Sequence, residues 1–237
     1  LRSIAVEVID LTINALKILK KNLNKNFDRA VNAIINCQSK IILCGVGKSG
    51  LIATKIASTL SSVGSPAFSL SANDCLHGDL GSITKKDVLV LISNSGKSEE
   101  IIPIIKFANR NKIKLIGIVS RKNSLLYKAS DIKILLPEVK ESGLGIVPTS
   151  STSIQLAIGD ALAIASLKRK QFSKYDFSRI HPGGNLGRQL KTVSDIMVSG
   201  RKIPFINENK SMKEALKLIS QKKLGVVIAC DKKKTTT

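Results

Sequence analysis

The stretch "DVLVLISNSGKSEE", residues 87–100, changes character halfway along its length. Its first half is a short apolar run of the kind that forms a buried strand. Its second half ends in two adjacent acids, Glu99 and Glu100, and carries small polar residues that cannot build a core. Hydroxyl groups there can donate hydrogen bonds, and a glycine lets the backbone approach a ligand closely. These small polar residues are Ser93, Asn94, Ser95, Gly96 and Ser98.

Apolar runs and helical patterns alternate on both sides of this stretch. Strands are predicted at 40–45, 66–70, 87–93, 114–120 and 131–137, and helices at 49–63, 98–109 and 150–170. The N-terminal residues 4–36 show helical spacing with a break near 24–26. Strands that alternate with helices predict an α/β fold, a five-stranded parallel sheet flanked by helices on both faces.

Ligands of such folds bind at the carboxyl ends of the strands. The loops 45–50, 70–79, 93–100 and 120–124 should therefore share one edge of the sheet. "GVGKSG" (45–50) is neither a Walker A loop nor a full dinucleotide fingerprint, and Gly-rich turns after strands are common. For "SNSGKSEE" (93–100) the alternative is an ordinary capped helix start, with serine as the N-cap and acids in the first turn. However, "PTSSTS" (148–153) opens another helix in the same way. Three such turns in one parallel sheet favour a phosphate site.

The texture of the chain changes after Leu190. A short strand, an amphipathic helix at 211–222 and one more strand follow, and the pattern stops before a second core could be completed. We therefore expect two domains, residues 1–192 and an incomplete α+β unit at 193–237.

Composition narrows the classes of partner. No apolar run reaches the roughly 20 residues that cross a bilayer, and no leader pattern precedes the first helix, so we expect a cytoplasmic protein without a membrane partner. The formal charge of +21 comes mostly from scattered lysines, without a nucleic-acid-binding motif. We therefore predict no nucleic-acid partner, and a positive field that attracts small phosphorylated ligands. The four cysteines form no CxxC pair and should be free thiols.

A series of motifs in order resembles a known family. They are "GVGKSG" (45–50), "HGDLG" (77–81), "ISNSGKSEEI" (92–101), "VPTSST" (147–152), "GDALA" (159–163), "HPGGNLGR" (181–188) and "VSDIM" (193–197). Together they resemble the arabinose-5-phosphate isomerases, which join a flavodoxin-like sugar isomerase (SIS) domain to a pair of CBS domains. The resemblance implies interconversion of ribulose 5-phosphate and arabinose 5-phosphate, the entry step to Kdo in lipopolysaccharide. It also implies a homotetramer, a small phosphorylated sugar as ligand, and no cofactor.

Aldose–ketose isomerisation needs a base between C1 and C2, an acid for the oxygens, and stabilisation of the enediolate. The resemblance assigns catalytic relevance to Lys48, Glu100, Glu141 and His181. Either glutamate could be the base, Lys48 would stabilise the enediolate or the phosphate, and His181 would open the sugar ring or shuttle a proton. The residues expected to bind substrate are Gly47, Ser49, Gly64, Ser65, His77, Ser93, Asn94, Ser95, Gly96, Ser98, Thr149, Ser150 and Ser151.

Several positions depart from the family pattern. Family members often carry a histidine associated with zinc where this chain has Ser71, so we predict no metal site. Asp74 replaces a glutamate, and the loop around Glu141 is shorter than usual. The CBS region is truncated. Two alternatives therefore stay open, an SIS isomerase of another phosphosugar and a non-catalytic module that binds a phosphosugar.

Overall fold

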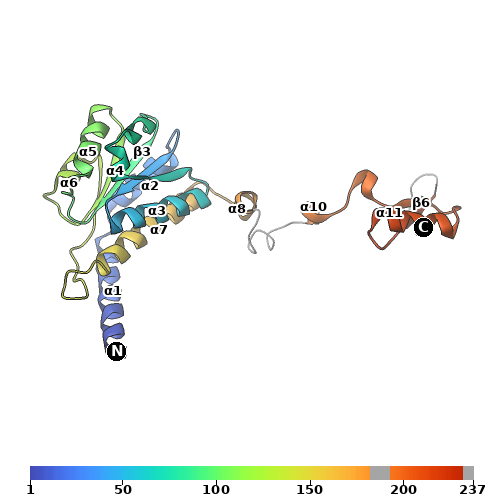
Figure 1. The fold of residues 1–237 in the computed structure, drawn as a ribbon, viewed down its shortest axis with the longest axis horizontal. Helices are drawn as coiled ribbons and strands as arrows, with labels where there is room; N and C mark the ends of the chain where they lie inside the picture. The colour runs from blue at the N-terminus through green and yellow to red at the C-terminus, as the bar shows by residue number, and fades with distance from the viewer. Residues whose placement is uncertain (182–192, 232–237) are drawn as a thin grey trace. The chain divides into compact units, whose positions relative to one another are not determined.

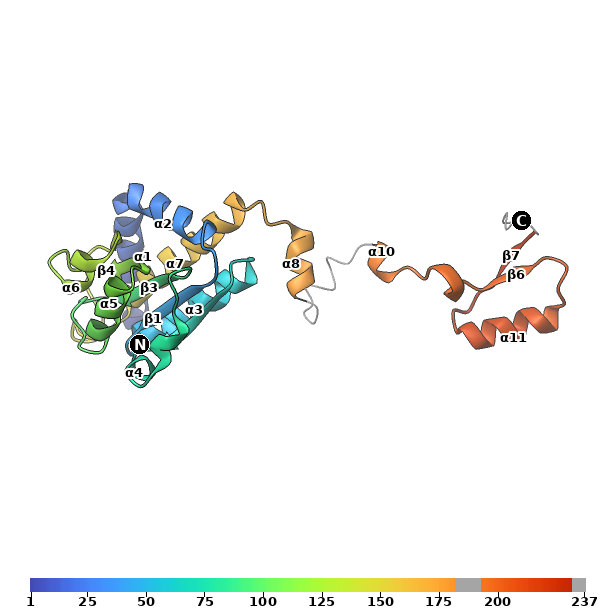
Figure 2. The ribbon, with the colours of Figure 1, turned by 90° about the horizontal axis from the view of Figure 1, so that it is seen from above.

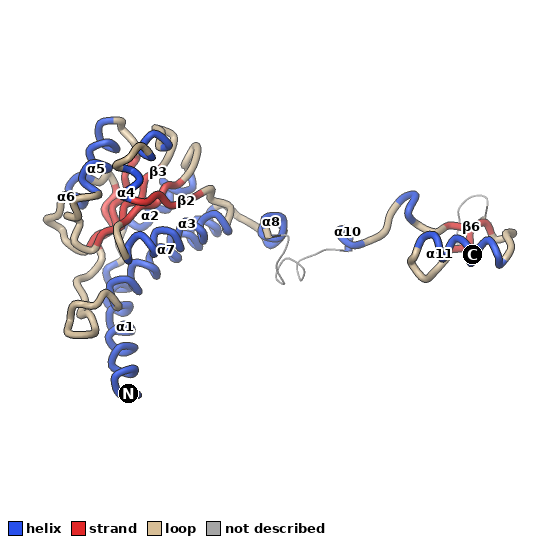
Figure 3. The backbone as a smooth tube through the Cα atoms, in the orientation of Figure 1, coloured by secondary structure: helices blue, strands red, loops and turns tan. Residues whose placement is uncertain are grey.

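The computed structural model describes residues 1–181 and 193–231, and the chain divides into two units, Leu1–Pro182 and Gly183–Thr237. Five strands form the sheet of the first unit (Figures 1 and 3). They are β1 (Ile41–Gly45), β2 (Ala67–Ser71), β3 (Val88–Ser93), β4 (Lys114–Val119) and β5 (Ile132–Leu135). Their order is β2-β1-β3-β4-β5, and every neighbouring pair is parallel. The predicted five-stranded parallel sheet is confirmed, and its order is that of flavodoxin-like folds.

Helices cover both faces of this sheet. They are α1 (Arg2–Asn22), α2 (Lys25–Ile35), α3 (Lys48–Ser62), α4 (Ala72–Cys75), α5 (Ile101–Arg110), α6 (Leu125–Ala129) and α7 (Ser150–Arg169), with a 3-10 turn η1 at Asp79–Ser82. A further helix, α8 (Lys174–Ile180), follows α7 and contributes no residue to either core. The break predicted near 24–26 falls between α1 and α2. Asn24 caps α2, because its side-chain Oδ1 accepts a hydrogen bond from the amide of Asn26 at 2.9 Å.

Alternate strand residues point to opposite faces, as the period of two in a strand requires. Leu43 and Val90 belong to the core under α1, α2, α3 and α7. Ile42 and Leu89 belong to a second core under α4, α5 and α6. Since β1 and β3 are buried along their whole length, they form the centre of the unit.

The parallel direction gives the sheet two distinct edges. The carboxyl edge is where the five strands end, and the amino edge is where they begin. α3 starts directly after β1 at the carboxyl edge and runs back along the sheet, and α7 packs beside it. Lys55 of α3 forms an ion pair with Asp160 of α7. The two helices therefore lie side by side, and both begin at the carboxyl edge.

The second unit holds α10 (Val193–Ile196), a 3-10 turn η2 (Gly200–Lys202), β6 (Phe205–Asn207), α11 (Met212–Lys222) and β7 (Ile228–Cys230). β6 and β7 pair in parallel, so the predicted strand–helix–strand order is present. Ser211 and Glu214 form a capping box at the start of α11. The assignment of this unit to an incomplete CBS domain stays a prediction, and the expected boundary after Thr192 borders a segment outside the described residues.

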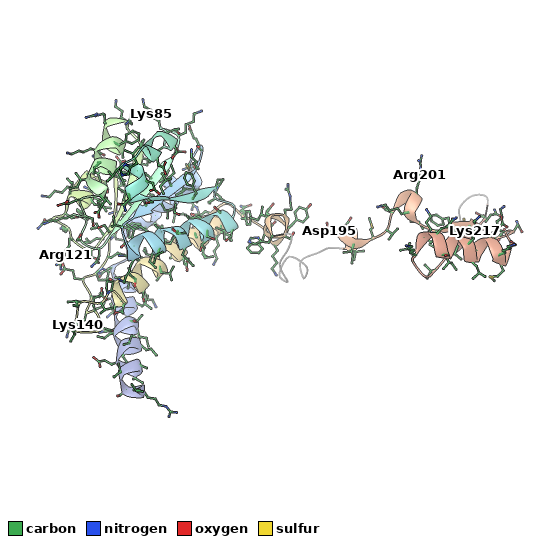
Figure 4. All side chains as sticks on the ribbon, viewed as in Figure 1. Lys85, Arg121, Lys140, Asp195, Arg201 and Lys217 are labelled. Carbon is green, nitrogen blue, oxygen red and sulfur yellow. The ribbon has the colours of Figure 1, made fainter. Side chains whose placement is uncertain are left out.

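The scattered basic residues and the free thiols expected from the sequence are both present in the structure. Figure 4 shows the labelled basic residues Lys85, Arg121 and Lys140 on separate loops of the first unit. All four cysteines are free thiols. Across 1–181 and 193–231, no helix has both the length and the apolar character that a membrane span requires.

Candidate active site

The carboxyl edge between β1 and β3 is the point where the chain connections diverge. β1 and β3 are neighbours in the sheet, but α3 packs on one face and α5 on the other. Figure 2 shows these two helices on opposite sides of the strands. In open α/β sheets this divergence marks the place where ligands bind. The loops 45–50 and 93–100, both predicted to hold phosphate, lie there.

The turn after β1 brings the start of α3 against the sheet. A side chain at Gly45 would place its Cβ 2.8 Å from the carbonyl carbon of Ser49 and 2.9 Å from the carbonyl oxygen of Ile92. Gly47 has φ of +56° and precedes Lys48, the first residue of α3. The first amides of a helix have no partner within the helix and carry its positive dipole end. Lys48 and Ser49 therefore lie at a helix start of the kind that binds anions in other proteins.

The loop after β3 folds back on itself. The amide of Gly96 donates to Ser93 Oγ at 3.0 Å, and the amide of Lys97 donates to Ser95 Oγ at 3.3 Å. Gly96 is buried with φ of +63°, and a Cβ there would collide with the side chain of Ser124. Since each serine oxygen acts as an acceptor, each hydroxyl proton remains available to donate. The loop is thus a preformed turn that carries hydroxyl donors.

Two residues after β4, not singled out from the sequence, support this loop. Ser120 Oγ donates to Asn94 Oδ1 at 2.7 Å, which orients the amide of Asn94. Ser124 accepts a hydrogen bond from the amide of Tyr127 at 3.2 Å and packs at Gly96. The hydroxyl-bearing "VSRKNS" (119–124) after a strand is the signal that could have identified them.

Glu100 lies at the start of α5, which begins later than expected. The predicted helix started at 98, whereas α5 begins at Ile101. The amide of Ile101 donates to the carbonyl oxygen of Ser98 at 3.2 Å, so residues 98–100 form a turn before the helix. Glu100 is half-buried in the N-cap position. Its carboxylate therefore belongs to the same loop as the hydroxyl donors.

Glu141 closes the loop after β5 onto the first turn of α7. Its Oε2 accepts hydrogen bonds from the amides of Thr149 (2.9 Å) and Ser151 (3.3 Å) and from Thr149 Oγ1 (3.2 Å). Burial acts to raise the pKa of this carboxyl, but the hydrogen bonds from Ser151 and Thr149 outweigh it and lower the pKa. Ser150 is buried beside them, and its Oγ has no hydrogen-bond partner among the described residues. Glu141 is held in its ionised form.

The loop after β2 brings two more predicted positions to the carboxyl edge. His77 is exposed, and its amide donates to the carbonyl oxygen of Asp74 at 2.9 Å. Ser71, at the zinc-associated position, caps α4 by accepting a hydrogen bond from the amide of Asp74 at 3.4 Å. Among the described residues, no group of three or more His, Cys, Asp or Glu side chains is placed to hold a metal ion.

Gly64 and Ser65 lie at the opposite edge of the sheet from the other predicted substrate-binding residues described so far. They precede β2 and therefore occupy the amino edge, separated from loops 45–50 and 93–100 by the length of the strands. Lys170 Nζ donates to Ser65 Oγ at 2.8 Å and to the carbonyl oxygen of Gly64 at 3.2 Å. Burial lowers the pKa of Lys170. Within one chain, these contacts join the end of α7 to the start of β2, and a substrate role for the pair stays a prediction.

His181 also lies on the side of the amino edge. α7 runs from the carboxyl edge to the contact of Lys170 with Ser65, and α8 continues beyond it (Figure 2). His181 ends α8, where its ring stacks on Phe177 with 3.8 Å between centroids. Its Nδ1 lies 2.8 Å from the carbonyl oxygen of Phe177. One chain therefore does not bring His181 together with Lys48 and Glu100.

Comparisons with known proteins identify the family of this chain. The model of the SIS domain family matches residues 34–165. The arabinose 5-phosphate isomerase KdsD of Yersinia pestis is 43% identical over 227 residues, which are 95% of this chain and 69% of that protein. An uncharacterized protein of Rickettsia prowazekii, RP505, is 39% identical over 231 residues, which are 98% of this chain and 72% of that protein.

A solved structure shares the fold of the first unit. An E. coli CFT073 protein in complex with A5P is 32% identical and has a TM-score of 0.73. The match covers 76% of this chain and 96% of that chain. The resemblance to an SIS protein is confirmed by the family model and by these relatives. The chain belongs to the SIS-domain family, in which it groups with sugar-phosphate isomerases.

Proposed function

We propose that this chain interconverts D-ribulose 5-phosphate and D-arabinose 5-phosphate through an enediolate. One observation carries the proposal. Lys48, at the start of α3, and the loop that carries Glu100 follow the neighbouring strands β1 and β3, so both lie at the same part of the carboxyl edge. Relatives named arabinose 5-phosphate isomerase support this choice of sugar. As the family resemblance implies, the arabinose 5-phosphate would enter Kdo synthesis for lipopolysaccharide.

The phosphate is bound by the first amides of α3 and by the hydroxyl groups of Ser93, Ser95 and Ser98. These groups are neutral donors next to a positive helix dipole, which suits a dianion. Lys48 adds a full positive charge at the same helix start and stabilises the enediolate oxygen. The reaction moves one proton between C1 and C2 and one between the oxygens of the same molecule. It therefore needs no external redox cofactor.

Glu100 is the better candidate for the base that moves the carbon-bound proton. The hydrogen bonds at Glu141 Oε2 lower the pKa of that carboxyl, and a weaker base accepts a proton from carbon less readily. Glu141 instead positions the first turn of α7, where Thr149, Ser150 and Ser151 contribute further hydroxyl groups to substrate binding.

A role for His181 in this reaction requires a second copy of the chain. Because α8 lies on the side of the amino edge, its histidine can meet a carboxyl edge only across a boundary between subunits. This requirement supports the proposal of a homotetramer, in which copies complete one another's sites. A sugar ring held between copies could then be opened by the imidazole.

The test compares Glu100→Gln with Glu99→Gln, a change at the exposed neighbouring acid. With ribulose 5-phosphate in deuterated solvent, NMR follows both product formation and incorporation of deuterium at the substrate carbon. Loss of the base should lower turnover by about 10²–10⁴-fold while phosphosugar binding persists. The Glu99 variant should keep normal turnover.

Three outcomes separate the remaining possibilities. Turnover of a different ketose phosphate, but not of ribulose 5-phosphate, would identify an isomerase of another phosphosugar. Binding by calorimetry without exchange or turnover in the unaltered protein would indicate a phosphosugar-binding module. Normal exchange in the Glu100 variant would show that another group is the base.

A further inference from the structure

The charge of the first unit is divided unevenly between the two edges of its sheet. At the carboxyl edge, acids offset the cations of the loops. The acids of these loops are Asp74, Asp79, Glu99, Glu100, Glu138 and Glu141, and the cations are Lys48, Lys97, Arg121, Lys122 and Lys140. At the amino edge, cations that lead into the strands outnumber the acids. These cations are Lys40, Lys85, Lys86, Arg110, Lys112 and Lys114.

The acids that lead into the strands, Asp87 and Asp131, have partners within the protein. Asp131 Oδ2 accepts the amide hydrogen of Leu115 at 2.8 Å. Asp87 is buried, and its Oδ2 accepts hydrogen bonds from Lys40 Nζ at 3.2 Å and from the amide of Thr84 at 2.6 Å. Burial acts to raise the pKa of Asp87, but its hydrogen bonds outweigh burial and lower the pKa. Asp87 therefore stays ionised and offsets Lys40, not the other cations.

Three of the remaining cations line a hollow of about 280 Å³, which we call the amino-edge hollow. Lys85 and Lys86 precede β3, and Lys114 is the first residue of the neighbouring strand β4. Val88 pairs with Lys114 in the sheet, so the three lysines come from adjacent stretches of backbone. All three are exposed, and none forms an ion pair with another residue of 1–181 or 193–231. The hollow therefore carries positive charge that the described residues leave uncompensated.

The end of α2 supplies another wall of the amino-edge hollow. Asn36 and Gln38 line it and are exposed, so their side-chain amides can donate hydrogen bonds to a ligand. Cys37, between them, holds this segment against the strands. Its Sγ donates to the carbonyl oxygens of Lys40 at 3.3 Å and of Lys86 at 3.6 Å. The hollow is thus built from a helix end and two strand starts that contact one another.

The amino-edge hollow is separate from the candidate active site. Lys86 precedes β3 and Ser93 ends it, and a strand of this length spans about 20 Å. Figure 4 shows Lys85 on the opposite side of the unit from Arg121 and Lys140, which belong to loops of the carboxyl edge. An anion in the hollow would therefore leave the loops proposed to bind the substrate phosphate unobstructed.

Charge and size favour a small ligand with several phosphate groups. An ammonium group is a compact point charge that binds phosphate, and three of them can be engaged together only by a ligand with several anionic groups. A volume of about 280 Å³ is near the lower end of the range for small-molecule pockets. A nucleic-acid strand instead follows an extended basic groove, whereas these lysines surround one hollow.

We propose that the amino-edge hollow binds a small ligand with a chain of two or three phosphate groups, through Lys85, Lys86 and Lys114. The phosphate chain is either free or part of a nucleotide. This site lies in the same unit as the candidate active site, but the proposal does not depend on the reaction at the carboxyl edge.

The first experiment measures the binding of inorganic tripolyphosphate to the full chain by isothermal titration, without sugar phosphate. Lys86→Glu and Lys114→Glu each reverse one charge at the hollow and should weaken binding by about tenfold or more. Lys217→Glu, on the exposed surface of α11, changes the net charge equally and should bind as the unaltered protein does. Circular dichroism verifies that the variants are folded. Added salt should weaken binding, because exposed charges are screened.

The second experiment separates the two edges and the two sources of the phosphate chain. Ser95→Asp adds a negative charge at the carboxyl edge, farther from the hollow than the screening length of about 8–10 Å, and should leave tripolyphosphate binding unchanged. Adenosine triphosphate is then compared with tripolyphosphate in the absence of divalent metal ions. Equal affinities would identify the phosphate chain alone as the ligand, and tighter binding of the nucleotide would identify a nucleotide.

Absence of tripolyphosphate binding, or equal binding by the Lys86, Lys114 and Lys217 variants, would overturn the proposal. Weaker binding in the Ser95 variant alone would place the tripolyphosphate at the carboxyl edge and would also overturn it. So would a protein that ignores tripolyphosphate but binds single-stranded DNA through Lys86 and Lys114, because the surface would then serve nucleic acid. An inactive chain that binds tripolyphosphate as expected would refute only the proposed reaction.

Discussion

Glu141 accepts the amide hydrogen of Thr149 at 2.9 Å, and this contact joins the loop after β5 to the first turn of α7. The carboxylate acts there as a cap for the helix, because it also accepts the amide hydrogen of Ser151 at 3.3 Å. A residue expected from family resemblance to take part in catalysis thus has a structural task that the geometry displays directly.

Replacement of Glu141 by Gln should lower the free energy of unfolding at pH 7 by about 1–2 kcal/mol, because charged acceptors form stronger hydrogen bonds. The folded pKa of this carboxyl is lowered, so its stabilisation is fully present above the unfolded pKa of about 4.3 and disappears as the pH falls through the folded value. Urea unfolding of both proteins at several pH values measures this difference. It should shrink below pH 4, and Glu138→Gln, at an exposed ion pair with Arg121, should change little. A pH-independent difference would contradict the assigned role.

Replacement of Ser95 by Asp should weaken sugar-phosphate binding by at least about tenfold, because it places a negative charge in the loop proposed to bind the phosphate dianion. Isothermal titration with arabinose 5-phosphate measures the effect. Ser220→Asp, on the exposed surface of α11, adds the same charge to the second unit and should bind normally. Equal binding by both variants would place the phosphate elsewhere.

Replacement of Gly45 by Ala should cost about 1–3 kcal/mol of stability, because backbone atoms of Ser49 and Ile92 occupy the space of the new methyl group. The start of α3 must move away from β3, so phosphate affinity should fall as well. Gly81→Ala is the matched control, since nothing lies within 4 Å of its Cβ position. Thermal unfolding and calorimetry report the two effects, and a Gly45 variant as stable as the control would refute the close approach.

A chain that ends at Thr192 should keep the fold of the first unit and bind sugar phosphate. The carboxyl-edge residues and both apolar cores belong to residues 1–181. Circular dichroism should therefore show the helices of the first unit, and calorimetry and ultracentrifugation should give the affinity and protomer number of the full chain. Loss of binding in a folded, shortened chain would show that residues 193–237 support the site.

All five strands could be predicted because each is an apolar run between turn residues in a sheet covered on both faces. The α5 boundary could not, because Ser98, a good N-cap on pattern alone, instead accepts a hydrogen bond from Ile101 in a turn. The sequence placed Lys48, Ser93 and Glu100 at one edge, since carboxyl ends of parallel strands coincide. Gly64 and Ser65 directly precede the strand predicted at 66–70, so the same rule places them at the amino edge, and only the family resemblance grouped them with the substrate-binding residues. His181 follows the last predicted helix of the domain, and no strand end indicates its edge. The contact of Lys170 with Ser65 shows in three dimensions that α7 ends at the amino edge.

Gly159 lets α7 lie so close to α3 that a methyl group at this position would collide with the side chain of Ile56. The contact is nine residues from the start of α7, a distance of about 14 Å along the helix. Because α3 and α7 both begin at the carboxyl edge, their separation at Gly159 influences the distance between their positively polarised N-termini. The electric field at the proposed phosphate site would therefore depend on packing inside the core. Exchanges of small and large side chains at this crossing would let related chains tune ligand affinity while every residue that touches the ligand stays the same.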